Sequence, residues 1–291
     1  MGGLYALILL RLIMKYAAFN SNAYLHHIAL NTTRPLKLSK FYEKALSMER
    51  KPTKNGWVLS GGRRKILILT NKKNCLGFAS FACQDSHSLK ALKRDFMEKG
   101  LKTVQDDKSL FDHDNFHILD CDGNKIYFGL AKNKKDQNSN LYAPLQHITF
   151  TSENLDNFVD FYINKLGFKI SDKVINKKGK LTTCFMRSNQ EHHTVACFLS
   201  DKSGLDHYSF EAGTWEWIKN WCDHFSKQNI QLIWGPGRHG PGNNLFAFIE
   251  DPDGNKIEIS AELEVIHDRQ TKKWPHEPKT LNLWGNAIMR S

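Results

Sequence analysis

The chain has 291 residues, of which 41 are Lys or Arg and 30 are Asp or Glu, so its formal net charge is 41 − 30 = +11. Hydrophobic residues make up 41% and charged residues 24% of the sequence, close to ordinary globular usage, which disfavours disordered and fibrous proteins. At roughly 150 residues per domain, this length predicts two domains. No apolar run reaches the roughly 18 residues of a membrane helix, and the scattered Lys residues do not form an Arg-rich patch with aromatic residues. We therefore expect neither a membrane protein nor a nucleic-acid-binding protein.

The cysteines and the N-terminus bear on the cellular compartment. Six cysteines are spread along the chain without a CxxC pair, which disfavours a disulfide framework or a cysteine-rich zinc site and is typical of a reducing, cytoplasmic environment. The apolar stretch at residues 4–13 (LYALILLRLI) is too short to span a membrane and lacks the flanks of a signal peptide. With Met14 as an alternative start, we expect residues 1–21 to form an extension outside the fold.

Four segments in chain order share one rhythm, a strand followed by an amphipathic helix and then further strands. The opening strands are predicted at 24–30, 77–83, 145–150 and 205–210. The helices are predicted around 38–46 and at 88–99, 155–166 and 214–228. The closing strands are predicted at 57–59, 65–70, 125–130 and 256–260. The pattern predicts an α+β protein built from four βαβββ modules.

Two phrases show that the modules pair into duplicated halves. CDGNKIYFG, from Cys121, and PDGNKIEIS, from Pro252, are near copies whose glycines are offset by 254 − 123 = 131 residues. LHHIAL and LQHITF match with an offset of 147 − 27 = 120 residues. The polar stretch between the halves has linker composition. We therefore expect domains at 22–131 and 142–265, a linker at 132–141 and a tail at 266–291.

Three residues of the second half stand at equivalent strand positions: His147, His207 and Glu258. Two imidazoles and a carboxylate on adjacent strands match the facial triad that leaves open positions on a non-haem Fe(II), although the same ligands also suit Mn(II) or Zn(II). The matching positions of the first half are His27, Phe78 and Tyr127. Because phenylalanine cannot ligate a metal, we expect a metal in the second half alone.

The paired repeats, this triad and the closing DPDGNKIEI resemble the vicinal oxygen chelate superfamily over residues 22–265. The resemblance is to its type I extradiol ring-cleaving dioxygenases, of the catechol 2,3-dioxygenase and 2,3-dihydroxybiphenyl 1,2-dioxygenase kind. It implies that each half is a curved mixed sheet forming an incomplete barrel. It also implies Fe(II), with Mn(II) as the other option, O2 as co-substrate, a small aromatic diol as substrate and a homo-oligomer.

The resemblance assigns two catalytic histidines. In NQEHHTVACF, from Asn189, His193 matches a histidine that lies over the metal and acts as acid and base. We expect its neighbour His192 to face solvent, because adjacent strand residues point to opposite faces. In WGPGRHGPG, from Trp234, His239 matches a histidine beside the substrate. This loop also satisfies GxGxxG, but the strand that follows it excludes a dinucleotide-binding turn.

Four further residues are expected at the substrate. Trp234 and Phe248 are candidates for the pocket wall, and Arg238 either orients its loop or meets an anionic substituent. Phe248 stands where these dioxygenases usually carry a Tyr that hydrogen-bonds the substrate, and loss of that donor costs about 1–3 kcal/mol. Thr149 is the candidate for a compensating hydroxyl, with a purely structural role in its strand as the alternative.

The resulting hypothesis is an Fe(II)-dependent extradiol dioxygenase, which inserts both atoms of O2 into a catechol-type diol and opens the ring beside the hydroxyls. A glyoxalase-like lyase or isomerase that uses its metal as a Lewis acid is the alternative, and it accommodates Phe248. A small-molecule-binding resistance protein is a third reading, disfavoured by the intact triad. For the tail at 272–285 (KKWPHEPKTLNLWG) we favour a strap on the domain over a lid above the site.

Overall fold

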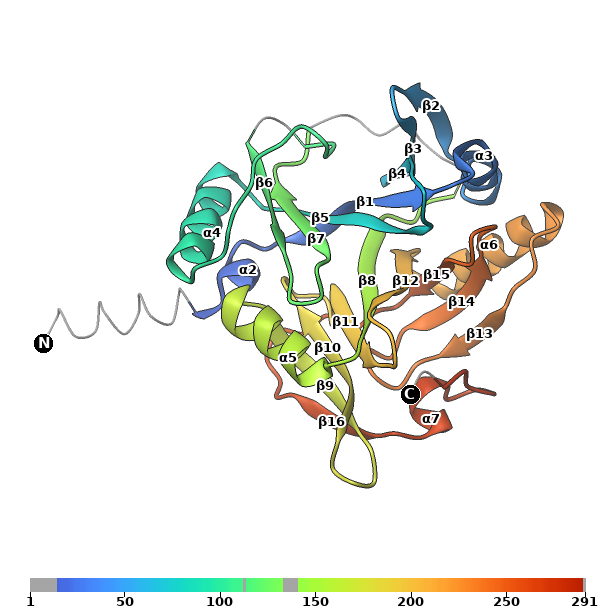
Figure 1. Ribbon diagram of the computed structural model, residues 1–291. Coiled ribbons are helices and arrows are strands. Elements are labelled where there is room, and N and C mark those ends of the chain that lie inside the picture. The colour runs from blue at the N-terminus through green and yellow to red at the C-terminus, as the bar shows by residue number, and fades with distance from the viewer. Residues whose placement is uncertain (1–14, 112–113, 133–140, 290–291) are drawn as a thin grey trace, which may run out of the picture.

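The computed structural model describes residues 15–111, 114–132 and 141–289, and it contains one mixed β-sheet from each half of the chain (Figure 1). The first sheet has seven strands in the order β2-β3-β4-β1-β5-β7-β6. The second has nine strands in the order β13-β14-β15-β12-β8-β11-β10-β9-β16. Neither order returns to its first strand, so both sheets stay open. The predicted α+β architecture of two tandem repeats is confirmed.

The first half contains three helices and seven strands among its described residues. The helices are α2 (Ala17–Asn20), α3 (Pro35–Ala45) and α4 (Ser86–Glu98). The strands are β1 (Tyr24–Thr32), β2 (Glu49–Thr53), β3 (Gly56–Gly61), β4 (Arg64–Thr70), β5 (Cys75–Ala82), β6 (Asn115–Leu119) and β7 (Lys125–Gly129).

The second half repeats this order and adds a C-terminal segment. Its helices are α5 (Leu155–Asp160), the π-helix η1 (Phe161–Lys165), α6 (Trp215–Lys227) and α7 (Pro278–Leu281). Its strands are β8 (Leu145–Ser152), β9 (Lys169–Ile175), β10 (Leu181–Arg187), β11 (Val195–Leu199), β12 (Gly204–Glu211), β13 (Trp234–Arg238), β14 (Leu245–Glu250), β15 (Lys256–Ala261) and β16 (Lys272–Pro275).

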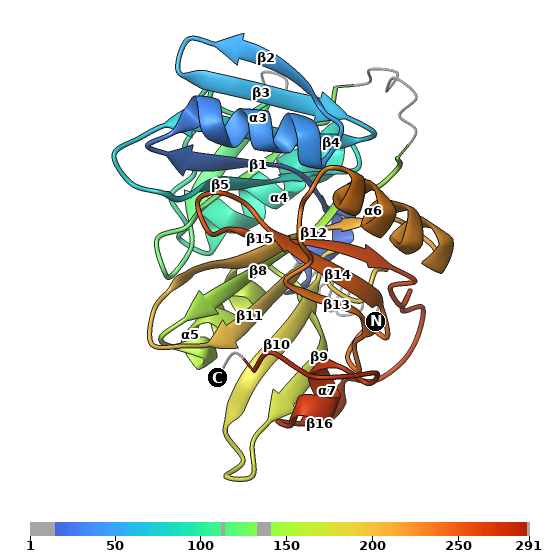
Figure 2. The ribbon, with the colours of Figure 1, turned by 90° about the vertical axis from the view of Figure 1, so that its right-hand side faces the viewer.

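The pairing of strands explains how each half forms one sheet. The opening strands of two modules pair antiparallel at its centre, β1 with β5 and β8 with β12. Each opening strand also pairs in parallel with the closing strand of its own module. The sheets lie one above the other in Figure 2, and one buried apolar cluster, which includes Ile28, Phe81, Phe150 and Ile257, extends through both halves. The closing strand of the last module therefore lies beside a central strand, away from the sheet edges.

The structure contains strands for which no range was predicted, among them β6, β9 and β10, and three further differences bear on the architecture. Strand β2 was not predicted, because ERKPT is polar and mostly exposed, and its Pro52 is tolerated at a sheet edge. The predicted helix at 155–166 is α-helical only as far as Asp160 and then widens into η1. Strand β16, from the tail, pairs in parallel with β9 and extends the second sheet. The residues 1–14 and 133–140, which include most of the expected extension and linker, lie outside the described residues. The expectation that the extension stays outside the fold as far as residue 21 is wrong, because α2 packs into the core through the buried Ala18.

Among the residues that the structure describes, no helix is long and apolar enough to cross a membrane.

The repeated Asp-Gly turns fasten the two halves to each other. In each turn an aspartate, Asp120 or Asp251, accepts backbone N–H groups two and four residues further along the chain. Its other oxygen receives a tyrosine hydroxyl from a helical segment of the opposite half, from Tyr162 to Asp120 at 3.1 Å and from Tyr42 to Asp251 at 2.7 Å. The tyrosines are offset by 162 − 42 = 120 residues and the aspartates by 251 − 120 = 131, as in the sequence repeat. The interface therefore contains the same bond twice.

We expect Tyr162→Phe to lower the free energy of unfolding by about 1–3 kcal/mol, because it removes a buried hydrogen bond to a carboxylate. Denaturation in urea, followed by tryptophan fluorescence, measures the change. Tyr24→Phe is the matched control, since Tyr24 is 40% exposed. Equal midpoints and slopes of the urea unfolding curves for both variants would show that the bond from Tyr162 to Asp120 does not contribute to stability.

Candidate metal centre

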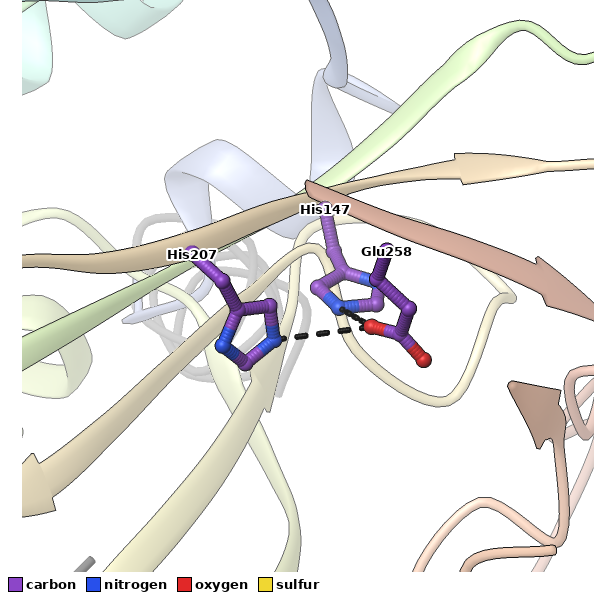
Figure 3. A group of neighbouring side chains, drawn as sticks. All are labelled: His147, His207 and Glu258. Carbon is purple, nitrogen blue, oxygen red and sulfur yellow. Dashed lines mark ion pairs between the residues drawn. The ribbon is translucent and has the colours of Figure 1, made fainter. Parts of the chain in front are cut away.

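Three adjacent strands bring His147, His207 and Glu258 together. The middle strand β12 lies between β8, which carries His147, and β15, which carries Glu258. Ser209 of β12 is the register partner of both His147 and Glu258. His207 precedes Ser209 by two residues, and alternate residues of a strand share a face. The three side chains accordingly point toward one another in Figure 3.

The ligand atoms converge on one carboxylate oxygen. Oε2 of Glu258 lies 3.0 Å from Nε2 of His147 and 3.5 Å from Nε2 of His207. One ligand atom from each of the three residues lies within 4.8 Å of the other two, and all three side chains are buried. Two neutral imidazoles and one carboxylate are a suitable set for a divalent transition metal.

Neighbouring side chains orient each ligand. The residue before each histidine accepts a hydrogen bond from its Nδ1, Gln146 Oε1 for His147 at 2.5 Å and Asp206 Oδ1 for His207 at 2.6 Å. Each Nε2 therefore carries a lone pair toward the centre, as metal-binding histidines do. Asn244 donates to Oε1 of Glu258 at 3.2 Å and to Ser260 at 2.9 Å. These contacts show that the residues present fit a bound metal.

The charges at the centre are consistent with that fit. Burial would raise the pKa of the Glu258 carboxyl, but His147, His207 and His239 hold that pKa well below its usual range. Burial lowers the pKa of His147. Burial also opposes the charged form of His207, but its bonds to Asp206 and Glu258 raise its pKa. The centre thus contains an ionised carboxylate, which a divalent cation would neutralise.

The two expected catalytic histidines also lie at the centre. The ring of His193 is 4.3 Å from that of His147, and burial, with the neighbouring imidazoles, lowers its pKa well below the usual value. The lowered pKa favours the neutral form of the His193 ring. His239 donates from Nδ1 to the backbone oxygen of Leu281 at 2.5 Å, and its Nε2 lies 3.6 Å from Oε1 of Glu258.

The expectation for His192 is wrong, because this residue is fully buried. Strand β11 begins only at Val195, so His192 and His193 lie in an irregular segment where the alternation of faces does not apply. Nδ1 of His192 is 2.9 Å from Nδ1 of His193, and its Nε2 is 3.1 Å from Oδ2 of Asp172.

A largely apolar cavity adjoins the three ligands and also reaches Thr149, His193 and His239. Its apolar wall is formed by Phe185, Phe198, Trp234, Phe248, Leu281 and Ile288. The ring of Phe248 packs edge-on against His207 at 5.2 Å and stacks on Trp234 at 5.3 Å. The hydroxyl of Thr149 is buried and has no hydrogen-bond partner in the described structure.

Arg238 lies outside this cavity lining. Its guanidinium pairs with Glu262 at 2.8 Å and donates to the backbone oxygen of Asn243 at 2.7 Å. These contacts match the orienting role that was one of its two expected functions.

Sequence reasoning missed several groups around the centre. Gln146 and Asp206 carried a detectable signal, because each is a polar residue directly before a predicted ligand. Asn244 and the wall residues Leu281 and Ile288 gave none, since only the tertiary fold brings them to the cavity. The tail is both a strap, through β16, and part of the pocket wall.

The equivalent positions of the first half make other contacts. Nε2 of His27 accepts the backbone N–H of Leu110 at 3.0 Å, and the hydroxyl of Tyr127 donates to Asp106 at 2.6 Å. Phe78 packs edge-on against His27, with ring centroids 5.9 Å apart. Side chains and backbone thus fill this face of the first sheet.

Comparison with known proteins places the second half in a family. Residues 145–259 match the Glyoxalase/Bleomycin resistance protein/Dioxygenase superfamily. Metapyrocatechase 2 of Cupriavidus necator is 26% identical over 131 residues, which are 45% of this chain and 39% of that protein. A probable lactoylglutathione lyase of Synechocystis sp. is 29% identical over 121 residues, 40% of this chain and 92% of that protein. The chain therefore matches well under half of the longer relative.

Solved structures resemble the whole fold. A variant of homoprotocatechuate 2,3-dioxygenase from B. fuscum superposes with a TM-score of 0.79 at 20% identity, covering 90% of this chain and 78% of that one. The Mn(II)-bound glyoxalase from Novosphingobium aromaticivorans also has a TM-score of 0.79, at 21% identity, covering 92% of both chains. The chain thus resembles the Glyoxalase/Bleomycin resistance protein/Dioxygenase superfamily in sequence over residues 145–259 and shares the fold of these solved structures over about 90% of its length.

Proposed function

We propose that this protein is an Fe(II)-dependent extradiol dioxygenase that cleaves a catechol-type diol beside its hydroxyls. The observation that carries the proposal is the meeting of three metal ligands and two further histidines, His193 and His239, at one buried apolar cavity. We place the catalytic domain at 142–265 and a domain without metal at 22–131. We expect the protein to act in the cytoplasm as a homo-oligomer.

His147, His207 and Glu258 would hold the iron, which when bound supplies coordination for the two diol oxygens and exchanges electrons between the ring and O2. The protein supplies binding and proton transfer. His193, which is neutral, can accept a proton from a diol hydroxyl at the cavity. His239 is fixed by its bond to Leu281, so its Nε2 stays directed toward the centre.

The wall of the cavity indicates the class of diol. It is aromatic and aliphatic, and none of its described lining residues is Lys or Arg. Arg238, the one residue expected to meet an anionic substituent, is bound to Glu262 instead. An uncharged catechol with an alkyl or aryl substituent therefore fits better than one that carries a carboxylate, which would lose water without gaining a cation.

A glyoxalase-like lyase is the second candidate, favoured by Phe248. The cavity lacks the tyrosine hydroxyl that extradiol dioxygenases usually direct at the substrate, and an edge-on aromatic ring takes its place. The similarity to a probable lactoylglutathione lyase and to a Mn(II)-bound glyoxalase agrees with this alternative. The two candidates differ in their need for O2.

Oxygen consumption tests the proposal directly. After anaerobic loading with Fe(II), we expect O2 uptake and a yellow product with catechol and 2,3-dihydroxybiphenyl, and a slower reaction with 3,4-dihydroxyphenylacetate. His147→Ala and Glu258→Gln should abolish uptake, whereas His87→Ala, at an exposed position, should not change it. The lyase would replace the dioxygenase as the proposed function if two results were obtained. The iron-loaded protein would consume no O2 with any catechol, and the protein loaded with Zn(II) or Ni(II) would show lyase activity.

We expect Asp206→Ala to weaken metal binding by about 10–100-fold, because His207 loses the acceptor that orients it. Competition with a chromophoric chelator measures the affinity. Asp201→Ala removes an exposed carboxylate from the loop just before β12 and should bind metal like the parent. Similar affinities for the two variants would mean that Asp206 does not support the ligand.

We expect Thr149→Val to weaken anaerobic binding of catechol to the iron-loaded protein by up to about tenfold, because the variant lacks the unpartnered hydroxyl. The substitution preserves the side-chain volume, so metal content and the midpoint of urea unfolding should stay at the parent values. A parent-like dissociation constant for catechol would assign Thr149 a structural role.

A further inference from the structure

A line of buried polar groups runs from the cavity into the protein behind His193. His193 is followed by His192, at 2.9 Å between their Nδ1 atoms, and then by Asp172, 3.1 Å from Nε2 of His192. Asp172 and His192 are both fully buried. The two histidines are neighbours in the sequence, but Asp172 comes from β9, at the far side of the second sheet.

Asp172 is held as an anion. It accepts from Nε1 of Trp274 at 2.7 Å and from Nη1 of Arg269 at 2.9 Å. Burial would raise the pKa of its carboxyl, but the contacts with His192, Trp274 and Arg269 hold that pKa below its usual value. Arg269 also forms two bonds to Glu264, at 2.6 and 2.7 Å, so its guanidinium is fixed.

We propose that Asp172 and His192 are positioning residues that decide which ring nitrogen of His193 carries the proton. Nε2 of His192 lies at ion-pair distance from Oδ2 of Asp172, although without the alignment of a hydrogen bond. A carboxylate accepts and cannot donate, so the nitrogen beside it is favoured as N–H. In the neutral ring, Nδ1 of His192 is then an acceptor. The short contact between the two Nδ1 atoms requires one donor, so His193 supplies an N–H from its Nδ1. Nε2 of His193 is left with a lone pair at the cavity.

This assignment makes His193 a base at the cavity and not a donor. Such a role rests on the proposed function, since the dioxygenase reaction begins with a diol that loses a proton. The tautomer itself is a property of the fold and can be measured without any reaction. Serine proteases provide a precedent, because an aspartate there selects the tautomer of the catalytic histidine. Replacing that aspartate by asparagine leaves the geometry intact but gives the other tautomer.

Nuclear magnetic resonance of the protein loaded with Zn(II), which is diamagnetic, provides the test. With ¹⁵N-labelled histidine, long-range ¹H–¹⁵N spectra distinguish a ring protonated at Nδ1 from one protonated at Nε2, and loss of signals in His193→Ala assigns the ring. We expect His193 of the parent protein to be protonated at Nδ1. Protonation of His193 at Nε2 in the parent protein would overturn the inference without any variant.

Three variants extend the test. In Asp172→Asn the amide can donate to Nε2 of His192, so we expect His193 to shift to the Nε2-protonated form. His192→Asn places a carbonyl oxygen near the former Nδ1 and should keep the parent tautomer, whereas His192→Leu offers no acceptor and should lose it. Asp95→Asn is the matched control, a buried carboxylate paired with Lys99 at 2.7 Å in the first half. An unchanged His193 tautomer in both Asp172→Asn and His192→Leu would overturn the inference.

Kinetics connect the tautomer to turnover. We expect kcat for O2 uptake to fall by about 10²-fold or more in Asp172→Asn and His192→Leu, and to stay near the parent value in His192→Asn and Asp95→Asn, with KM little changed throughout. A parallel rise in KM without loss of kcat would contradict the positioning role. If no variant and no parent protein consumes O2 while the tautomers follow the expected pattern, the proposed dioxygenase fails and the assignment of His193 stands.

Discussion

The arrangement of the second half centres on one buried charge. The carboxylate of Glu258 is 1% exposed and is surrounded by His147, His207, His239 and the amide of Asn244. A buried carboxylate is costly unless another charge compensates it. A divalent cation bound by Nε2 of both ligand histidines would do so, and the bonds from Nδ1 to Gln146 and Asp206 already direct the lone pairs that such a cation needs.

Duplication explains how the chain can maintain such a centre. Both halves use the same frame of central antiparallel strands flanked by parallel closing strands, and reciprocal tyrosine–aspartate bonds join them. In the first half the positions equivalent to the ligands are satisfied internally, by the backbone of Leu110 and by Asp106. That half therefore needs no cation for its polar groups. It contributes buried apolar surface, the turn at Asp120 and the helix α3 with Tyr42 to the interface between the halves.

The sequence predicted the parts of the site that follow from local pattern and repetition. His147, His207 and Glu258 could be found because each occupies the same place in its module, and the structure brings them together. His192 was misjudged because the strand pattern was extended three residues too early, and burial in an irregular segment has no periodic signal. Asp172, Asn244 and Arg269 were beyond reach for a different reason. Each meets the centre only through strand pairing or a chain reversal that no local pattern encodes.

The C-terminal segment supports both histidines beside the metal ligands, His193 and His239, through different contacts. On one side, Trp274 and Arg269 hold Asp172, which lies behind His192 and His193. On the other side, the backbone oxygen of Leu281 receives Nδ1 of His239. The bond to Leu281 holds His239 by its Nδ1, and its Nε2 lies 3.6 Å from Oε1 of Glu258. Because Leu281 and Ile288 also line that cavity, the segment that holds these polar groups also covers the cavity with apolar side chains. The contacts of Trp274, Arg269 and Leu281 therefore hold the C-terminal segment in place and also fix polar groups at the site.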